Sequence, residues 1–202
     1  MRSSSLLCVA SLFIGLLATH ASMADTREVF HPQQFEDRDS SLMIDFTQED
    51  EATRWTVTND SVMGGLSSGR MTLADTYSVF SGIVSLENNG GFTSINRPIN
   101  ALPSGLGRVE IDIEGDGSTY QLRAAVLNDG YRMSYKHDFK TEPNVRQTLS
   151  FSLRDFQASF RGRLITDAPD LQSEHIRQVG FLVADKRQGP FTLKLYKLTI
   201  TH

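Results

Sequence analysis

Apolar and polar side chains alternate with a period of two along much of the chain. Residues 109–114 place three β-branched apolar side chains between three acids, a pattern typical of a strand with one buried face. Residues 120–126 and 131–139 alternate in the same way on either side of Asn-Asp-Gly at 128–130. Because these turn residues tolerate positive φ, the segment predicts a β-hairpin.

Further short strands are predicted at 149–153 and 179–183, and a long one at 191–201. The last strand changes phase near Leu195 and Tyr196, which indicates either a β-bulge or burial on both faces. Helical periodicity is confined to short pieces around 48–54 and 171–176. Many short strands separated by Gly, Asn, Asp and Pro predict an all-β sandwich or barrel.

The front of the chain has the pattern of a secretory signal peptide. Arg2 precedes an apolar run at 6–17, and small residues follow up to Ala24. Twelve apolar residues are too few to cross a bilayer, which needs about 20. We therefore expect a signal peptide at 1–24, cleaved after Ala24 or alternatively after Ala21. An N-terminal arm at 25–41 and one domain at 42–202 would follow, and the protein would be periplasmic or secreted.

The charge and the cysteine content of the chain argue against several classes of function. Without Arg2, the chain carries 24 acidic and 19 basic residues, a net charge of −5, and it has no basic run. Nucleic acid is therefore an unfavourable partner. The single cysteine, Cys8, lies within the signal segment, so the remaining chain has no disulfide and no cysteine-based nucleophile or metal site. We expect no cofactor and no stable membrane anchor.

Two patterns suggest chemistry, each with a simpler structural interpretation. Gly65-Leu66-Ser67-Ser68-Gly69 matches the G-x-S-x-G motif of hydrolases, but a strand-like pattern follows where a helix is required, so we favour a turn. Asp112, Glu114 and Asp116 would share one face of a strand. They would either contribute to a Ca²⁺ site, with oxygens from other loops, or face water, which we favour.

Two segments that each contain a pair of glycines stand out, residues 59–67 and residues 88–92. Each pair follows Asn or Asp and adjoins apolar residues. Consecutive glycines allow positive φ and a close approach to another surface. Both segments are therefore either tight connections between strands, which we favour, or direct binding surfaces.

These segments carry a family resemblance. Trp55, the run 59–69, Phe80-Ser81-Gly82 and the run 86–92 resemble the complex I intermediate-associated protein 30 family. Gly115-Asp116-Gly117 with Tyr120, the segment 156–162 and the closing strand from Phe191 are similar to that family as well. The resemblance spans about 42–200.

The resemblance implies a jelly-roll β-sandwich similar to galactose-binding domains. It also implies a non-enzymatic assembly-factor or chaperone role toward a protein partner, because mitochondrial members assist assembly of respiratory NADH:ubiquinone oxidoreductase. The secretory signal distinguishes this chain from those members. No catalytic residue is carried over. The motif residues form our candidate binding surface: Asp60, Met63, Gly64, Gly65, Ser67, Asn89, Gly90, Gly91 and Phe92.

Two other functions remain open. A carbohydrate-binding module of the cell envelope would need an exposed aromatic ring beside polar groups, for which Trp55, Tyr77, Tyr131 and Tyr135 are available. A hydrolase would use Ser67 as its nucleophile.

Overall fold

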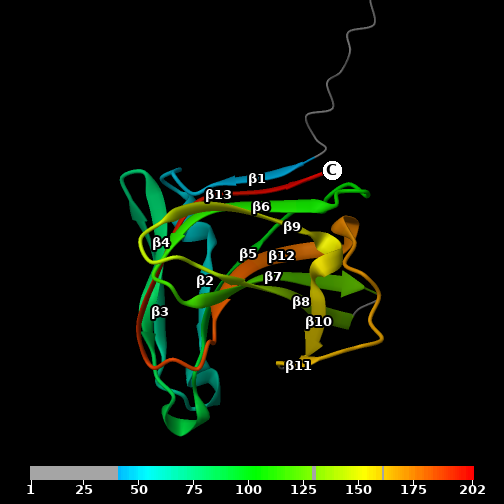
Figure 1. Ribbon diagram of the computed structural model, residues 1–202. Helices are drawn as coiled ribbons and strands as arrows, with labels where there is room; N and C mark the ends of the chain where they lie inside the picture. Colours follow the sequence, from blue (N-terminus) through cyan, green and yellow to red (C-terminus); the bar gives the residue numbers. More distant parts are fainter. Residues whose placement is uncertain (1–40, 129–130, 161) are drawn as a thin grey trace, which may run out of the picture. The chain divides into compact units, whose positions relative to one another are not determined.

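The computed structural model describes residues 41–202 apart from 129, 130 and 161, and without the side chains of Asn128 and Tyr131. The expected signal peptide and nearly all of the expected arm lie outside the described residues. The described chain forms thirteen β-strands and five short 3-10 helices (Figure 1). The all-β prediction is confirmed. None of the helical segments in this part of the chain has the length and apolarity that a bilayer crossing requires.

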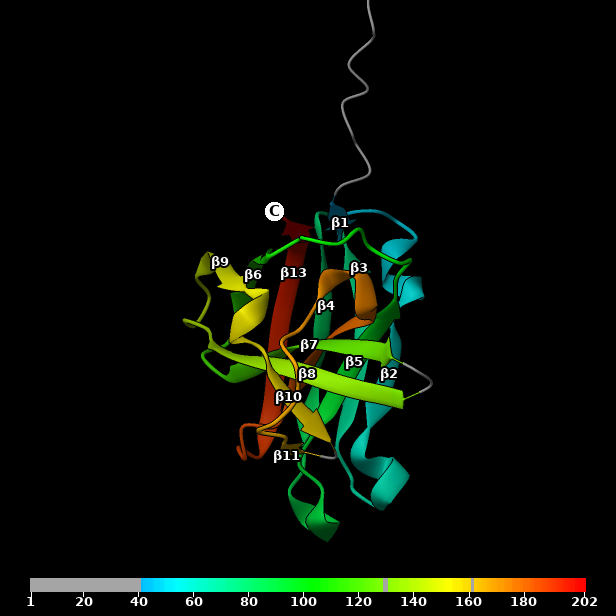
Figure 2. The same ribbon diagram turned by 90° about the vertical axis from the view of Figure 1, so that its right-hand side faces the viewer.

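The strands form two antiparallel sheets that enclose one core (Figures 1 and 2). The six-stranded sheet has a five-strand path, and β1 pairs with the second half of its central strand. Its strands are, in order, β3 (Ser68–Ala74), β4 (Tyr77–Val84), β13 (Gly189–Thr201), β6 (Arg108–Gly115) and β9 (Arg146–Ser152), with β1 (Leu42–Asp45) beside β13.

The seven-stranded sheet contains the predicted hairpin, in which β7 and β8 pair up to Asn128 and Tyr131. Its strands are, in order, β11 (Arg163–Leu164), β10 (Gln157–Phe160), β8 (Tyr131–Lys140), β7 (Thr119–Asn128), β12 (Ile176–Val183), β5 (Thr93–Pro98) and β2 (Thr56–Asn59).

A β-bulge in strand β13 accounts for the change of phase in its sequence. Its register against β6 shifts between Leu195 and Lys197, so Tyr196 is an extra residue. The buried residues are Leu193 and Leu195 before the shift and Leu198 and Ile200 after it. Because one inserted residue reverses the alternation, both halves of the strand point apolar side chains into the core. The bulge interpretation is confirmed, and burial on both faces is wrong.

The helical pieces are shorter than their sequence patterns suggest. They are the 3-10 turns η1 (Glu51–Arg54) and η5 (Ser173–His175). The strand predicted at 149–153 ends at Ser152, because Leu153 begins η4 (Leu153–Asp155), which Ser152 caps with its side chain. Two further turns, η2 (Asp60–Met63) and η3 (Glu87–Asn89), are each followed directly by one of the glycine pairs.

Candidate functional site

Both glycine-rich segments lie at the same end of the sandwich (Figures 1 and 2). The first connects β2 to β3 through η2, and the second connects β4 to β5 through η3. Because β2 pairs with β5 and β3 pairs with β4, the strands bring together two connections that are about 30 residues apart in sequence.

The carboxylate of Asp60 joins the two segments. Its side chain is 0% exposed. One oxygen, Oδ1, accepts a hydrogen bond from the Ser67 amide at 2.9 Å. The other, Oδ2, accepts from the Ser67 hydroxyl at 2.5 Å and from the amides of Gly91 at 2.6 Å and Phe92 at 3.3 Å. We call these four groups the Asp60 network.

The network stabilises the charged form of the carboxylate. Burial alone raises a carboxyl pKa, because it removes water from the charge. The hydrogen bonds from the Ser67 hydroxyl and from the amides of Gly91, Phe92 and Ser67 outweigh burial and hold the pKa of Asp60 below its ordinary value. A buried anion can therefore persist here without a basic partner.

The close packing around this carboxylate requires glycine at two positions. A Cβ atom at Gly65 would lie 2.3 Å from Cγ of Asp60, and one at Gly90 would lie 2.5 Å from Oδ2. Both distances are far below van der Waals contact. One glycine of each pair is thus explained by the approach of backbone to the Asp60 side chain.

Ser67 joins the network to Ser85, the residue that follows β4. Its hydroxyl accepts from the amide of Ser85 at 2.9 Å and lies 3.2 Å from the Ser85 carbonyl oxygen. The candidate residues therefore converge on one point, but they differ in exposure. Asp60, Gly65 and Ser67 are buried, Gly90, Gly91 and Phe92 are half-buried, and Met63, Gly64 and Asn89 are exposed.

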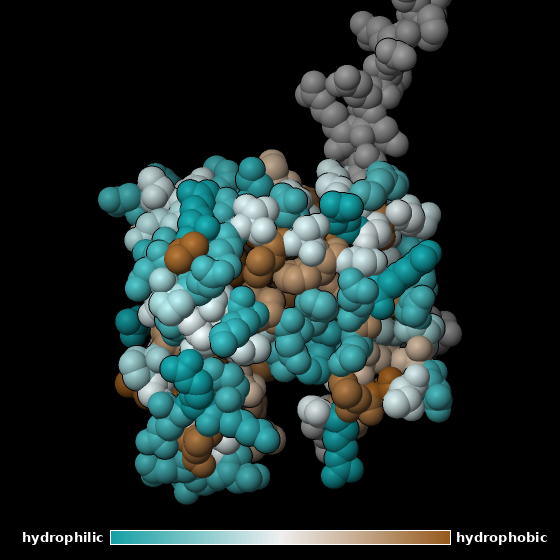
Figure 3. Space-filling model, in the orientation of Figure 1, coloured by the Kyte–Doolittle hydropathy of each residue, from teal (hydrophilic) through white to brown (hydrophobic). Residues whose placement is uncertain are grey.

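Exposed apolar side chains surround this end of the domain. Four large ones lie on the two connections, and three of them are not in our candidate set. No hydrophobic periodicity marks them in the sequence, because they lie outside the strands. They are Val62 (72% exposed), Met63 (67%), Leu66 (56%) and Leu86 (41%), which we call the apolar tip. Figure 3 shows a small hydrophobic patch within a largely hydrophilic surface at the lower end, where η2 and η3 lie in Figure 1.

Ser67 does not have the surroundings of a hydrolase nucleophile. Its side chain is buried, and its hydroxyl is committed to Asp60 and Ser85. Strand β3 begins at the next residue, Ser68, whereas a nucleophile elbow leads into a helix. Residues 65–67 are part of the connection between η2 and β3, and Ser68 and Gly69 already belong to β3, so the segment is not a nucleophile elbow.

The three acids considered for calcium are engaged separately. Asp112 pairs with Arg146 at 2.6 Å, and Glu114 pairs with Lys194 at 2.6 Å. Asp116 accepts from the hydroxyl of Tyr120 and from backbone amides. Among the described residues, no three His, Cys, Asp or Glu side chains gather as a metal site.

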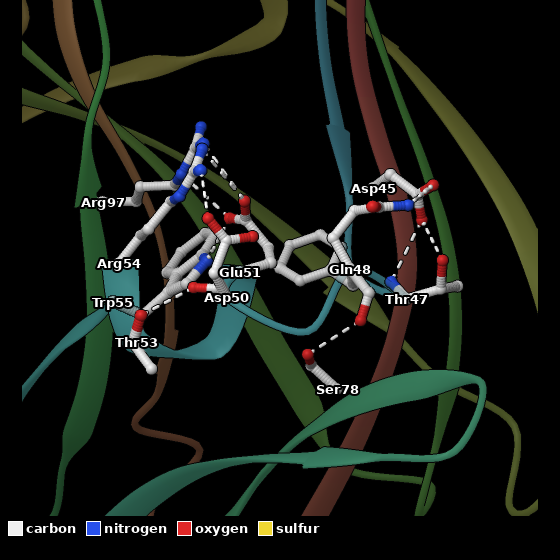
Figure 4. Close-up of polar contacts among 11 residues, drawn as sticks. Asp45, Thr47, Gln48, Asp50, Glu51, Thr53, Arg54, Trp55, Ser78 and Arg97 are labelled. Atoms are coloured by element: carbon white, nitrogen blue, oxygen red, sulfur yellow. Dashed lines mark hydrogen bonds and ion pairs between the residues drawn. The ribbon is translucent and has the colours of Figure 1, made fainter.

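Two of the four rings considered for sugar stacking are in the core. Trp55 is buried against Phe46 and donates its indole N–H to Glu51 at 2.9 Å (Figure 4). Tyr135 is buried and donates to the carbonyl of Pro169. The prediction that these two rings are available to stack on a sugar is wrong, because both side chains face the core. Tyr77 is half-buried beside Tyr196, and the Tyr131 side chain lies outside the described residues.

A second surface was missed from the sequence. The outer face of the seven-stranded sheet carries a shallow groove of about 470 Å³ over β2, β5 and β12. Adjoining it, a smaller depression continues over β7 and β8. Polar residues dominate the first part of the groove, which is lined by Thr56, Thr58, Ser94, Asn96, Pro98, Arg132 and Gln178. The polar phase of the strands at 120–126 and 131–139 indicated only the part that contains Arg123 and Arg132, because the pairing register aligns the rest.

Solved structures confirm the type of fold. One similar structure is the family 11 carbohydrate-binding module of a cellulosomal cellulase of Clostridium thermocellum, with a TM-score of 0.58 and 13% identity over 80% of this chain and 94% of that chain. The same module in complex with a β-1,3-1,4-mixed-linked tetrasaccharide has a TM-score of 0.55 and 14% identity, covering 80% of this chain and 95% of that chain. At these identities, the likeness establishes the jelly-roll sandwich alone.

The family is established by sequence. A comparison with curated proteins found no match. Residues 44–195 match the family model described as complex I intermediate-associated protein 30 (CIA30). That span includes both glycine-rich connections, the Asp60 network and most of both sheets. The chain therefore belongs to the CIA30 family.

Proposed function

We propose that the domain is a non-enzymatic binding module that holds a protein partner through its apolar tip, in the manner of an assembly factor or chaperone. The observation that carries the proposal is the combination of exposed Val62, Met63, Leu66 and Leu86 with backbone fixed by a buried carboxylate. Membership of the CIA30 family supports it.

Rigid turns that present apolar side chains favour association. Exposed apolar residues clustered on neighbouring loops mark interaction surfaces more often than isolated ones do. A preorganised surface also loses less conformational freedom when it binds. The Asp60 network provides that organisation, because it joins both connections through one carboxylate. We further propose that the partner lies outside the cytoplasm, in line with the predicted signal peptide.

Site-specific photocrosslinking tests the proposal. A photoreactive residue at Met63 should crosslink one discrete protein in the native cells. The adduct should disappear when Leu66→Ser and Leu86→Ser remove the neighbouring apolar contacts. The matched control is Met43, which is 65% exposed but lies on β1. Equal adducts from both positions, or none from Met63, would contradict the proposal.

Carbohydrate binding is a second candidate function. The polar groove on the seven-stranded sheet supports it, because sugar hydroxyls require convergent hydrogen-bonding groups. The fold shared with modules that bind carbohydrate is consistent with it. A glycan array that reveals no ligand would contradict this second function without affecting the first.

A further inference from the structure

One cross-strand row of the seven-stranded sheet passes through the polar groove and the depression beside it, where Thr56 and Asn96 line the groove and Arg123 lines the depression. The register places Thr56 opposite Asn96, Asn96 opposite Gly180, Gly180 opposite Arg123, and Arg123 opposite Lys136. The row crosses five strands, a length of about 19 Å at the usual strand spacing. It therefore suits a short linear oligomer better than a single small molecule.

Two small residues lie in this part of the sheet. Gly180 lies at the middle of the row, and Ala125, which is opposite Gln178 on β7, lines the depression. A Cβ at Gly180 would lie 2.7 Å from Oδ1 of Asn96, so glycine lets the Asn96 amide lie across the strand.

The side chains that line the groove offer both hydrogen-bond donors and hydrogen-bond acceptors. Asn96 donates to the hydroxyl of Ser94 at 3.2 Å, which leaves the rest of its amide available. Gln178 accepts from Arg132 at 2.5 Å and keeps its own amide donors. Such mixed donors and acceptors match hydroxyl groups, each of which both donates and accepts.

Two arginines in the groove donate hydrogen bonds to neutral side chains. Arg123 donates to the side-chain oxygen of Gln121 at 2.9 Å, and Arg132 donates to that of Gln178. Within the described part of the chain, neither forms an ion pair with a carboxylate, whereas Arg97 and Arg146 do. Both line the same depression. The groove therefore carries two guanidinium groups with which no described carboxylate pairs directly, although the charge of Asp138 acts on Arg123 from a greater distance.

Burial strengthens the argument for an anion at Arg123. Its side chain is half-buried, and burial lowers its pKa because the charge is partly removed from water. A guanidinium remains charged at neutral pH regardless. A ligand carboxylate would compensate this desolvated charge, and the planar fork of arginine matches a carboxylate through two parallel hydrogen bonds.

We propose that this groove binds an acidic oligosaccharide, whose ring carboxylates pair with Arg123 and Arg132 and whose hydroxyls bond to Asn96 and Gln178. This inference rests on the second candidate function, carbohydrate binding, and it names the class of sugar. The ligand is a uronic acid chain, since carboxylates fit the guanidinium fork and hydroxyls fit the amide walls.

Calorimetric titration of the full chain with tetragalacturonate and with its methyl ester tests the inference. The ester keeps the same rings but carries no charge. The acid should bind about tenfold more tightly or better, because charged hydrogen bonds are the stronger ones. Arg132→Gln should weaken binding of the acid by a similar factor, and Arg123→Gln should do the same. Arg70→Gln, an exposed position on β3 of the other sheet, should leave it unchanged.

The outcomes separate the inference from the function on which it rests. Equal binding of acid and ester would keep carbohydrate binding and overturn the acidic ligand. No binding of either sugar or of a neutral mixed-linked tetrasaccharide would overturn both. Equal binding of a tetraglutamate peptide would identify an acidic peptide as the ligand class and overturn the sugar. Since Arg132 is exposed, its variant should fold, and thermal unfolding of that variant checks this.

Discussion

At the scale of single residues, one carboxylate determines the geometry of the candidate site. Asp60 is separated from Gly91 by 31 positions, yet their hydrogen bond is among the shortest in the network, at 2.6 Å. A buried anion costs free energy unless hydrogen bonds replace its water. Here the protein's own amides and one hydroxyl supply them, so the residues of the motif depend on one another.

The two close-approach glycines should be intolerant of a methyl group. Gly65→Ala and Gly90→Ala should each destabilise the fold by about 1 to 3 kcal/mol, because the added Cβ overlaps Asp60. Gly107→Ala is the control, since nothing lies within 4 Å of its Cβ position. Urea denaturation measures the differences. Equal effects at all three positions would contradict the packing argument.

Because of Asp60, the free energy of unfolding should also depend on pH. Because its pKa is lowered in the folded protein, its contribution is complete above the unfolded value, about 3.9, and is lost as pH falls through the folded value. Asp60→Asn should cost about 3 kcal/mol near neutral pH, and the cost should shrink below about pH 4.

Denaturation of Asp60→Asn and the wild type between pH 7 and pH 2 measures this dependence. Asp75→Asn, at an exposed position in the β3–β4 turn, should follow the wild type throughout. A constant difference between the Asp60 variant and the wild type across that range would contradict the lowered pKa.

At the scale of elements, sequence patterns found the strands that bury one whole face. The alternation in β6 and in the β7–β8 hairpin predicts them directly, and the phase change in β13 predicts its bulge. Strands β1 and β2 have four residues each, too few for a clear period. Their place depends on pairing with β13 and β5, which are distant in sequence.

The 3-10 turn η1 depends on a buried ion pair (Figure 4). Glu51 is buried and accepts hydrogen bonds from Nη2 of Arg97 at 3.1 Å and from the indole of Trp55, and Nε of Arg97 lies 2.8 Å from its carboxylate as an ion pair. Glu51→Gln and Arg97→Met should each cost about 3 kcal/mol, because the first leaves the largely buried Arg97 without a carboxylate and the second leaves Glu51 with only the exposed Arg54, 3.9 Å away. Thermal unfolding should show little change for Asp50→Asn, which breaks an exposed pair with Arg54. Equal losses would contradict this role for η1.

At the scale of the whole molecule, the sandwich separates two surfaces. The apolar tip lies on connections at one end of the sheets, and the polar groove lies on the outer face of one sheet. The motif residues of the tip were predictable, because glycine pairs beside Asn and Asp are distinctive. The groove was not, because its residues come from five strands, and only the register aligns them.

Amide hydrogen exchange, measured by NMR, tests the central claim that the Asp60 carboxylate fixes both connections of the tip. In the wild type, the amides of Ser67 and Gly91 should exchange slowly, with opening free energies near that of global unfolding, because both donate to Asp60. In Asp60→Asn, both should lose protection together. Exchange in the wild type as fast as at exposed Asn89 would contradict the account.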